Sequence, residues 1–202
     1  MSERFKYPDE REKLSAARVR ALEALLIDKG IITGETVDKV LSVFETQMGP
    51  FNGAKIVAHA WVDPAYKERL VADTPGAIAE LELPTGMAGA EGEHMRAVAN
   101  SPGVHNLIVC TLCSCYPWPV LGLPPYWFKD PTFRARAVRE PRTVLKEMGV
   151  NLAPSVEIRI WDSSAQVRWF VVPERPAGTE GMSEAELTKF VTPEAMMGVA
   201  VC

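Results

Sequence analysis

The sequence of 202 residues has no run of about 18 apolar residues, so we expect no membrane-spanning helix. Its first ten residues lack the apolar stretch of a secretory signal peptide, which makes a cytoplasmic location the default expectation. Basic residues are not in excess, because 22 Lys and Arg against 26 Asp and Glu give a net charge of −4. This balance argues against nucleic acid and against an anionic membrane surface as partners.

Several common catalytic motifs are missing as well. The sequence contains no Gly-rich phosphate loop, no His-Glu-x-x-His zinc motif, no nucleophile elbow and no EF-hand loop. Its only three histidines, His59, His94 and His105, are scattered. What is present is an ordinary globular composition, with 47% hydrophobic and 24% charged residues and no internal repeats. We therefore expect a folded protein whose chemistry does not depend on these motifs.

The N-terminal part of the chain has a helical pattern. Apolar residues recur at helical spacing over 14–26, and Gly30 is a suitable stop. A second helix follows and is expected to end at Gly49-Pro50. We therefore assign residues 1–50 to a helical N-terminal arm. Because the apolar stripe of its first helix is narrow, that helix could pack on a partner chain or on its own core.

Residues 51–202 combine helices with strands, which together with the helical start predicts an α+β fold. Each expected element has a local signal in caps, prolines or periodicity. We expect helices starting at Asp63-Pro64 and Thr74-Pro75, a loop with one short ordered piece over 84–104, a strand over 105–109, helices over 131–139 and 141–149, a hairpin of strands 155–161 and 166–172, and a last helix opened by the capping box Ser183–Glu186.

The distribution of cysteines is abnormal, because three of the four, Cys110, Cys113 and Cys115, fall within six residues. Disulfides are uncommon in the cytoplasm, and Cys113 and Cys115 are too close in sequence for normal disulfide geometry. A structural zinc site or an iron–sulfur cluster needs four ligands, so Cys202 or a scattered histidine would have to complete it. A redox pair of Cys110 and Cys113 leaves Cys115 without a role. Three buried structural cysteines remain the alternative without chemistry.

A metal ion held by three thiolates from one tight turn fits this cluster best. The Cys-Ser-Cys step brings the backbone nitrogens of Ser114 and Cys115 close to an ion bound by the sulfurs. Amide nitrogen binds a metal only when deprotonated, so these donors favour a trivalent ion, cobalt(III) or iron(III). Five protein ligands leave a sixth position open, which is typical of a catalytic site. Thiolates on such a metal near solvent are also prone to oxidation.

The segment Cys110–Pro119, followed by Leu-Gly-Leu-Pro-Pro, resembles the metal-binding segment of nitrile hydratase α subunits. The likeness extends over most of the chain. The other matching stretches are Asn52–Lys55, Ala60–Pro64, Arg134–Arg136, Glu140–Arg142, Glu157–Arg159 and Pro173–Glu180. One departure lies upstream, where many members have Gln-Gly-Glu and this chain has Glu91-Gly92-Glu93. The alternative to a site role for Glu91 is a solvated loop carboxylate.

This resemblance implies a set of metal ligands. They are the sulfurs of Cys110, Cys113 and Cys115 and the amide nitrogens of Ser114 and Cys115. In the family the second cysteine is a sulfinate and the third a sulfenate, here Cys113 and Cys115. A Thr after the first cysteine, here Thr111, is typical of cobalt enzymes, so we expect cobalt(III), with iron(III) as the less favoured metal.

The resemblance also implies the surroundings of that centre. It implies a layered α-β-β-α domain over residues 51–202 that carries the cysteine loop. Tyr116, a further indication of the cobalt type, and Trp118 are expected to line a substrate pocket. A β subunit closes the active site, with arginines that hold the oxidised sulfurs, in an α2β2 heterotetramer. A metallochaperone or activator is a further expected partner.

The implied reaction is the hydration of a small nitrile to an amide. The metal acts as a Lewis acid, and Cys113 and Cys115 are the expected catalytic residues. The attacking group stays open among a free water, a hydroxide on the metal and the sulfenate oxygen of Cys115. Two other functions are considered: the metal subunit of a thiocyanate hydrolase, with the same cobalt centre but other partner chains, and a zinc-binding structural module without catalysis.

Overall fold

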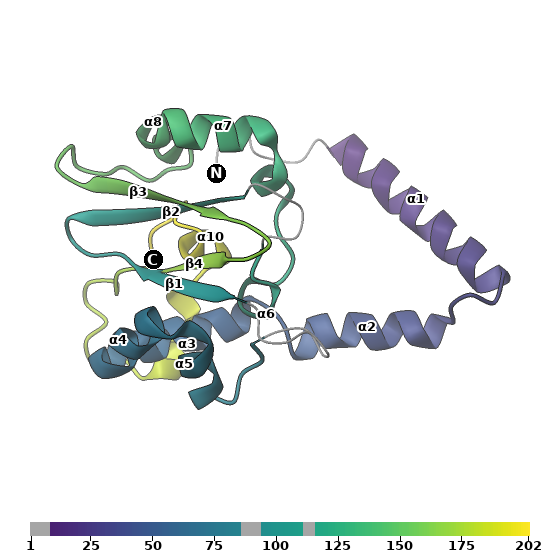
Figure 1. Ribbon diagram of the computed structural model, residues 1–202, viewed down its shortest axis with the longest axis horizontal. Helices are drawn as coiled ribbons and strands as arrows, with labels where there is room; N and C mark the ends of the chain where they lie inside the picture. The colour runs from purple at the N-terminus through teal and green to yellow at the C-terminus, as the bar shows by residue number, and fades with distance from the viewer. Residues whose placement is uncertain (1–8, 86–93, 111–115) are drawn as a thin grey trace.

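The computed structural model describes residues 9–85, 94–110 and 116–202 of the chain. In Figure 1 two small sheets lie between two groups of helices, so the main body has four layers. This arrangement confirms the predicted α+β class with its α-β-β-α layering. The layers are, in order, the helices α3 (Pro50–Val62), α4 (Pro64–Ala72) and α5 (Thr74–Glu80); the strands β1 (Met95–Ala99) and β4 (Arg168–Val172); the strands β2 (Val104–Cys110) and β3 (Glu157–Ser163); and the helices α7 (Pro131–Arg139) and α8 (Pro141–Glu147).

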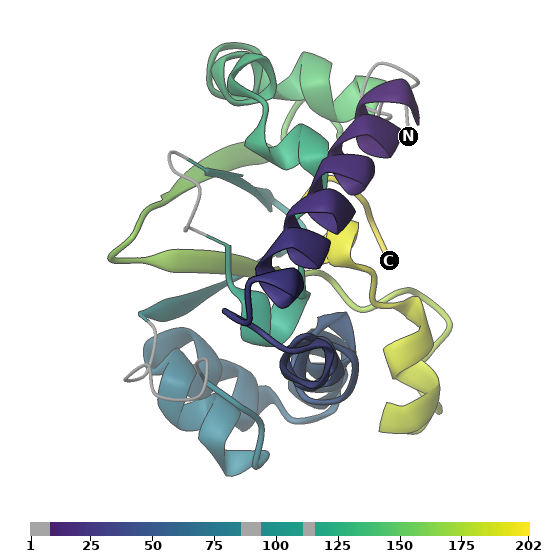
Figure 2. The ribbon, with the colours of Figure 1, turned by 90° about the vertical axis from the view of Figure 1, so that its right-hand side faces the viewer.

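The N-terminal helices α1 (Asp9–Asp28) and α2 (Gly34–Thr46) extend away from these layers (Figures 1 and 2). Gly30 follows α1 with a φ of 65°, as expected for a helix stop, and Thr33 caps α2. No described side chain of either helix is buried, and the apolar side chains Leu22, Leu25 and Leu41 are at least half exposed. The apolar stripe of α1 is therefore not packed on the core of this chain. The division at residue 50 into an arm and a domain stays a prediction.

Each helix of the first layer has a proline at its first or second position, where the preset backbone angle of proline suits a first turn. Asp63 caps α4 as predicted, with its carboxylate accepting from the Tyr66 N–H at 3.0 Å, and this bond lowers the pKa of Asp63. The cap of α5 is Asp73, one residue before the predicted Thr74. Thr74 is buried instead, where its hydroxyl donates to the Leu70 carbonyl and accepts from the Ala97 N–H. Thr74 therefore ties the helical layer to β1.

Both sheets are two-stranded and parallel. β1 pairs with β4 from Met95↔Arg168 to Ala99↔Val172, and β2 pairs with β3 from Val104↔Glu157 to Cys110↔Ser163. The predicted hairpin is therefore wrong, because its two strands, β3 and β4, belong to different sheets. The chain does reverse between them, and the Ser164 N–H donates to the Val167 carbonyl at 2.7 Å, but each strand bonds to a partner far away in sequence. The short ordered piece expected within 84–104 is β1.

The predicted helices over 131–139 and 141–149 are confirmed as α7 and α8. Arg136 of α7 joins them, since its guanidinium bonds Glu140 at 2.7 Å and Glu147 at 2.8 Å. The capping box at Ser183 is also present and opens α9. The remaining short helices are α6 (Trp118–Leu121), η2 (Tyr126–Lys129), α9 (Glu184–Leu187), η3 (Thr188–Phe190) and α10 (Pro193–Met196). In the described part of the chain, no helix combines the length and apolar character needed to span a membrane.

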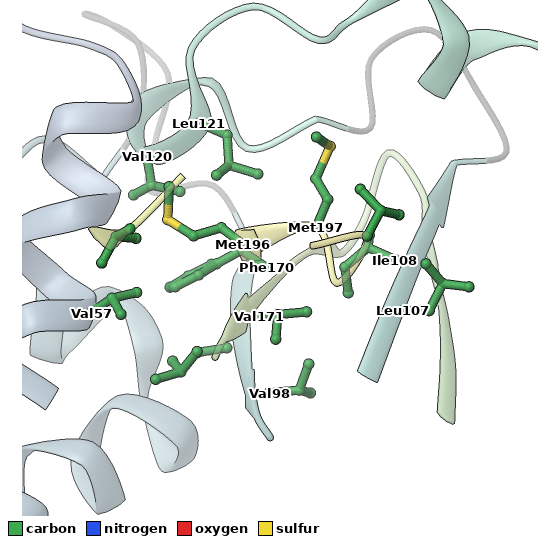
Figure 3. Packing of buried hydrophobic residues seen from close by; sticks show 14 of the residues in the cluster. Val57, Val98, Leu107, Ile108, Val120, Leu121, Phe170, Val171, Met196 and Met197 are labelled. Atoms are coloured by element: carbon green, nitrogen blue, oxygen red, sulfur yellow. The ribbon is translucent and has the colours of Figure 1, made fainter. Parts of the chain in front are cut away.

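The hydrophobic core lies between the layers, as Figure 3 shows for part of it. In Figure 3, Val171 of β4 and Ile108 of β2 point into the space between the two sheets, next to Met197. Phe170 points instead toward Val57 of α3, and Leu107 lies on the other side of β2. Each fully buried side chain of this size stabilises the fold by about 1.5–3 kcal/mol relative to leaving it exposed. β2 is covered on both sides, which is why its residues are buried without alternation, the polar His105 and Asn106 included.

One buried polar network joins the sheets to the C-terminal segment. His105 bonds the Gly198 carbonyl through Nε2 at 2.7 Å and faces the Asn100 side chain through Nδ1 at 3.4 Å. Burial lowers the pKa of His105, which favours the neutral ring in this place. Asn106 bonds the Asn100 side chain and accepts from the Trp161 indole. The network anchors β2 at its amino-terminal half.

Candidate metal centre

β2 carries the chain to the predicted metal loop and ends at Cys110. The residues before it, Leu107, Ile108 and Val109, are buried, so the strand is held by packing on both of its faces. Cys110 itself is only 6% exposed and lies opposite Ser163 of β3. The other predicted ligands, Cys113, Ser114 and Cys115, lie outside the described residues, as do Thr111 and Glu91.

The sulfur of Cys110 has a charged neighbour. The Lys129 ammonium of η2 donates to the Cys110 Sγ atom at 3.4 Å. Cys110 is disulfide-bonded in the structure, contrary to the expectation of no disulfide, and Cys202 is a free cysteine. A disulfide sulfur cannot serve as a thiolate ligand, so metal binding through Cys110 requires its reduced form. A buried sulfur beside a cation fits that role, because the positive charge favours the thiolate.

Tyr116, the first described residue after the loop, is fully buried rather than placed on a pocket surface within this chain. Its ring meets Phe128 of η2 edge to face, with centroids 5.3 Å apart, and its hydroxyl donates to the Met197 sulfur at 3.5 Å. Burial, with the negative charge of Glu194 as a smaller cause, raises the pKa of Tyr116. Its hydroxyl therefore stays protonated, and the ring holds the chain firmly just after the loop.

Trp118 begins α6 and is half-buried. Its ring lies against Phe44 of α2, with centroids 5.7 Å apart, so the arm reaches the segment that follows the loop. The indole Nε1 atom is buried and has no hydrogen-bond acceptor within the chain as described. A buried N–H group without an acceptor costs free energy of folding. This N–H is therefore suited to donate a hydrogen bond to a group from outside the described residues.

Two further charged residues, Asp162 and Lys129, lie near the end of β2, and neither belongs to a motif identified from the sequence. Asp162 of β3 is opposite Val109 and forms an ion pair with Arg134 of α7 at 2.5 Å. Asp162 is exposed. Lys129 was not singled out by any motif. Its one signal in the sequence is its position after the aromatic run Tyr-Trp-Phe, which suggests a side chain anchored by packing.

The histidines do not gather at Cys110. His105 is engaged by Gly198 and Asn100, His59 bonds the Glu184 carboxylate at 2.8 Å, and His94 is exposed. The described ranges hold no cluster of three or more His, Cys, Asp or Glu side chains suited to a metal ion. A zinc site completed by His105 is therefore incompatible with the bonds that this ring makes. The donors that remain fit a metal: the buried Cys110 sulfur, then two more thiols and the Cys-Ser-Cys amides.

Comparison with protein families matches residues 13–200 to the family described as nitrile hydratase, alpha chain. The chain is 55% identical over 186 residues to the low-molecular weight cobalt-containing nitrile hydratase subunit alpha of Rhodococcus rhodochrous, covering 92% of this chain and 88% of the relative. It is 52% identical over 195 residues to the cobalt-containing nitrile hydratase subunit alpha of Pseudonocardia thermophila, covering 96% and 94%. A matched span of this extent includes the whole cysteine segment.

Two further relatives bear on the fold and on the alternative function. A solved structure of a double mutant of the Fe-type nitrile hydratase from Comamonas testosteroni Ni1 matches with a TM-score of 0.82 and 39% identity, covering 94% of this chain and 90% of that one. The thiocyanate hydrolase subunit gamma of Thiobacillus thioparus is 39% identical over 188 residues, covering 90% of this chain and 77% of the relative. The similarity is thus greater to the cobalt-containing nitrile hydratase subunits than to the thiocyanate hydrolase.

Proposed function

The chain belongs to the nitrile hydratase α-chain family, and from this membership we propose that it is the metal-binding subunit of a cobalt enzyme that hydrates nitriles to amides. The family match across the cysteine segment is the observation that carries the proposal. Thiocyanate hydrolysis is the second candidate, and the lower identity to the gamma subunit ranks it behind nitrile hydration. Assays with a small nitrile and with thiocyanate on one preparation separate the two.

The proposed ligands of cobalt(III) are the sulfurs of Cys110, Cys113 and Cys115 and the amide nitrogens of Ser114 and Cys115. Support comes from the position of Cys110 at the end of a buried strand, with the Lys129 ammonium 3.4 Å from its sulfur. When bound at this site, cobalt(III) would act as a Lewis acid. We further propose that Cys113 carries a sulfinate and Cys115 a sulfenate, because thiolates on a metal near solvent are prone to oxidation.

In the reaction, water adds across the carbon–nitrogen triple bond to give an imidic acid, which tautomerises to the amide. The oxygen of the Cys115 sulfenate can take the proton of the attacking water or attack the nitrile carbon itself. In the second case a water must then attack the sulfur and cleave the S–O bond, which releases the imidic acid and restores the sulfenate. Cys113 lies two residues away in sequence. Trp118 would line the substrate pocket next to the loop, and the buried Tyr116 would support this wall from within the core. Tyr116 is held in place by its contacts with Phe128 and Met197 and therefore keeps this part of the pocket rigid. The Trp118 indole N–H can donate a hydrogen bond to a bound group.

A second chain completes the proposed enzyme. The exposed apolar side chains of α1 and α2 need a partner surface, and a β subunit in an α2β2 heterotetramer would cover them. That subunit would also supply the arginines that hold the oxidised sulfurs. A metallochaperone or activator would deliver the cobalt, and we place the enzyme in the cytoplasm.

Elemental analysis and intact mass of the chain, purified with its partner, test the proposal directly. We expect about one cobalt ion per chain, and added oxygens on Cys113 and Cys115 but none on Cys110. Zinc in place of cobalt would support a structural module. Unmodified thiols without cobalt or iron in active protein would overturn the assignment.

Substitution of the ligands is the matched test by mutation. Cys113→Ala or Cys115→Ala should lose cobalt and reduce nitrile hydration by more than about 100-fold, the largest effect usual for residues that only surround a metal. Cys202→Ala is the control, because Cys202 is a free cysteine whose burial raises its pKa to about 11 and keeps it an unreactive thiol. Full activity in either ligand variant would contradict the assignment, whereas the control should behave as the wild type.

A further inference from the structure

Lys129 lies next to the first proposed metal ligand, but the reaction proposed above gives it no role. Its ammonium lies 3.4 Å from the Cys110 sulfur, although the two residues are separated by the cysteine loop, α6 and a proline-rich turn. We infer that Lys129 is a positioning residue of the metal centre: its ammonium donates a hydrogen bond to the Cys110 thiolate and thereby weakens the electron donation of that sulfur to the cobalt. This inference rests on the proposed function, since it requires a bound metal.

The backbone of η2 holds Lys129 in this position by packing. Phe128 is 1% exposed and meets Tyr116 edge to face, while Trp127 is 5% exposed and meets Phe133 of α7 at 4.9 Å. The turn begins with the Phe128 N–H bonded to the Pro125 carbonyl at 3.1 Å. Lysine is a flexible side chain, and fixing its base removes much of the freedom that would otherwise oppose a defined contact. The aromatic neighbours thus direct the ammonium toward the end of β2.

Charge balance explains why a cation suits this place. The proposed ligands, three anionic sulfur groups and two deprotonated amides, carry more negative charge than a trivalent ion neutralises. A half-buried ammonium beside one of them offsets part of this excess where solvent screens it poorly. The nearest carboxylate on the paired strand, Asp162, already faces the Arg134 guanidinium at 2.5 Å. When Cys110 is reduced and negatively charged, its contact with Lys129 becomes a charge-assisted hydrogen bond.

A hydrogen bond to a metal-bound sulfur has a measurable electronic effect. It stabilises the sulfur lone pairs, so less charge passes to the metal and more energy is needed to excite an electron from sulfur to metal. Hydrogen bonds to cysteine sulfurs tune iron–sulfur centres in the same sense. Lys129 should therefore increase the Lewis acidity of the cobalt and shift the sulfur-to-cobalt absorption band to shorter wavelength. A residue that merely packs would leave that band unchanged.

The test uses the enzyme purified with its partner subunit and loaded with cobalt. Lys129→Met keeps the length of the side chain and removes the donor and the charge, while Lys129→Arg restores both. Lys146→Met is the matched control, because Lys146 is an exposed lysine of α8 in which the same change should have no effect. The readouts are cobalt content, the position of the charge-transfer band, and kcat and KM for a small nitrile.

We expect Lys129→Met to move the band to longer wavelength and to lower kcat on the order of 10-fold with little change in KM. Lys129→Arg should shift the band less, and Lys146→Met should match the wild type. If Lys129→Met folds but fails to load cobalt while Lys129→Arg loads, the donor is needed for binding and the inference stands. An unshifted band in cobalt-loaded Lys129→Met overturns it, as does failure of both Lys129 variants to load beside a loaded control. A wild-type enzyme without cobalt would instead refute the proposed function.

Discussion

Gly198 allows the C-terminal segment to lie in direct contact with β2. Its φ of 80° lies in the left-handed region, and a Cβ atom placed there would come within 1.9 Å of the Asn106 carbonyl oxygen. The close approach allows two bonds on the same strand, from His105 Nε2 to the Gly198 carbonyl and from the Ile108 N–H to the Met197 carbonyl. Those bonds hold β2 just before Cys110, so one glycine contributes to the position of the first proposed ligand.

Replacing this glycine should be strongly destabilising. In Gly198→Ala the new methyl group would collide with backbone and the residue would keep an unfavourable φ, so we expect a loss of at least about 2 kcal/mol in the free energy of unfolding. Gly181→Ala is the control, since nothing lies within 4 Å of a Cβ atom there. Denaturant unfolding of both variants measures the difference. Equal stability of the two would show that the segment can move away from β2 at no cost.

At the scale of elements, the joint between α2 and α3 links the arm to the metal loop. The buried Asn52 side chain donates to the Gln47 carbonyl at the end of α2 and to the Pro119 carbonyl in α6. The Gly49 N–H also donates to Pro119. A single amide therefore connects three elements: the last turn of the arm, the first helix of the main body and the segment that follows the cysteines.

We expect Asn52→Ala to destabilise this joint, because it removes two hydrogen bonds and leaves the Pro119 carbonyl with the Gly49 N–H alone as its backbone donor. The cost should be about 2 kcal/mol, which corresponds to a fall in Tm of roughly 4–8 °C for a chain of this size. Asn151→Ala, at an exposed asparagine, is the control. Thermal unfolding followed by circular dichroism measures both. A Tm for Asn52→Ala equal to that of the control would mean that water replaces the lost bonds fully.

At the scale of the whole molecule, the chain has a packed body and an unpacked arm. Figure 2 shows α1 crossing in front of the body, and no side chain described in that helix is buried. Stability therefore comes from the four layers and their common core. The arm instead exposes apolar surface that a second chain can bury, so its contribution should appear in assembly rather than in folding.

Removal of residues 1–32 separates these two contributions. The truncated chain should keep its Tm within about 4 °C, equivalent to roughly 1 kcal/mol, because the deletion takes no described side chain from the core. It should also lose most of its association with a co-expressed β subunit, as measured by size-exclusion chromatography. A much lower Tm would show that α1 supports the fold, and unchanged association would show that the arm is not the main contact.

Much of this protein could be predicted from local sequence. Caps at Asp63 and Ser183, prolines at the starts of α7 and α8, and the stop at Gly30 act through neighbouring backbone groups, so their effect does not depend on distant parts of the chain. The cysteine segment is informative for the same reason, since three thiols within six residues restrict the chemistry wherever the segment lies. These features were sufficient to indicate the fold class, the metal and the family.

The pairing of the strands and the charged neighbour of Cys110 could be known only from the tertiary structure. Strands β3 and β4 have hairpin spacing, yet each bonds a distant parallel partner, because the hydrogen-bonding edges and buried faces of β2 and β1 are matched only once the layers assemble. Lys129 likewise belongs to no motif, and only the packing of η2 brings its ammonium to the Cys110 sulfur. Local sequence patterns depend on interactions between residues that are a few positions apart. Strand partners and the charges around a metal depend instead on contacts between segments that are far apart in the sequence.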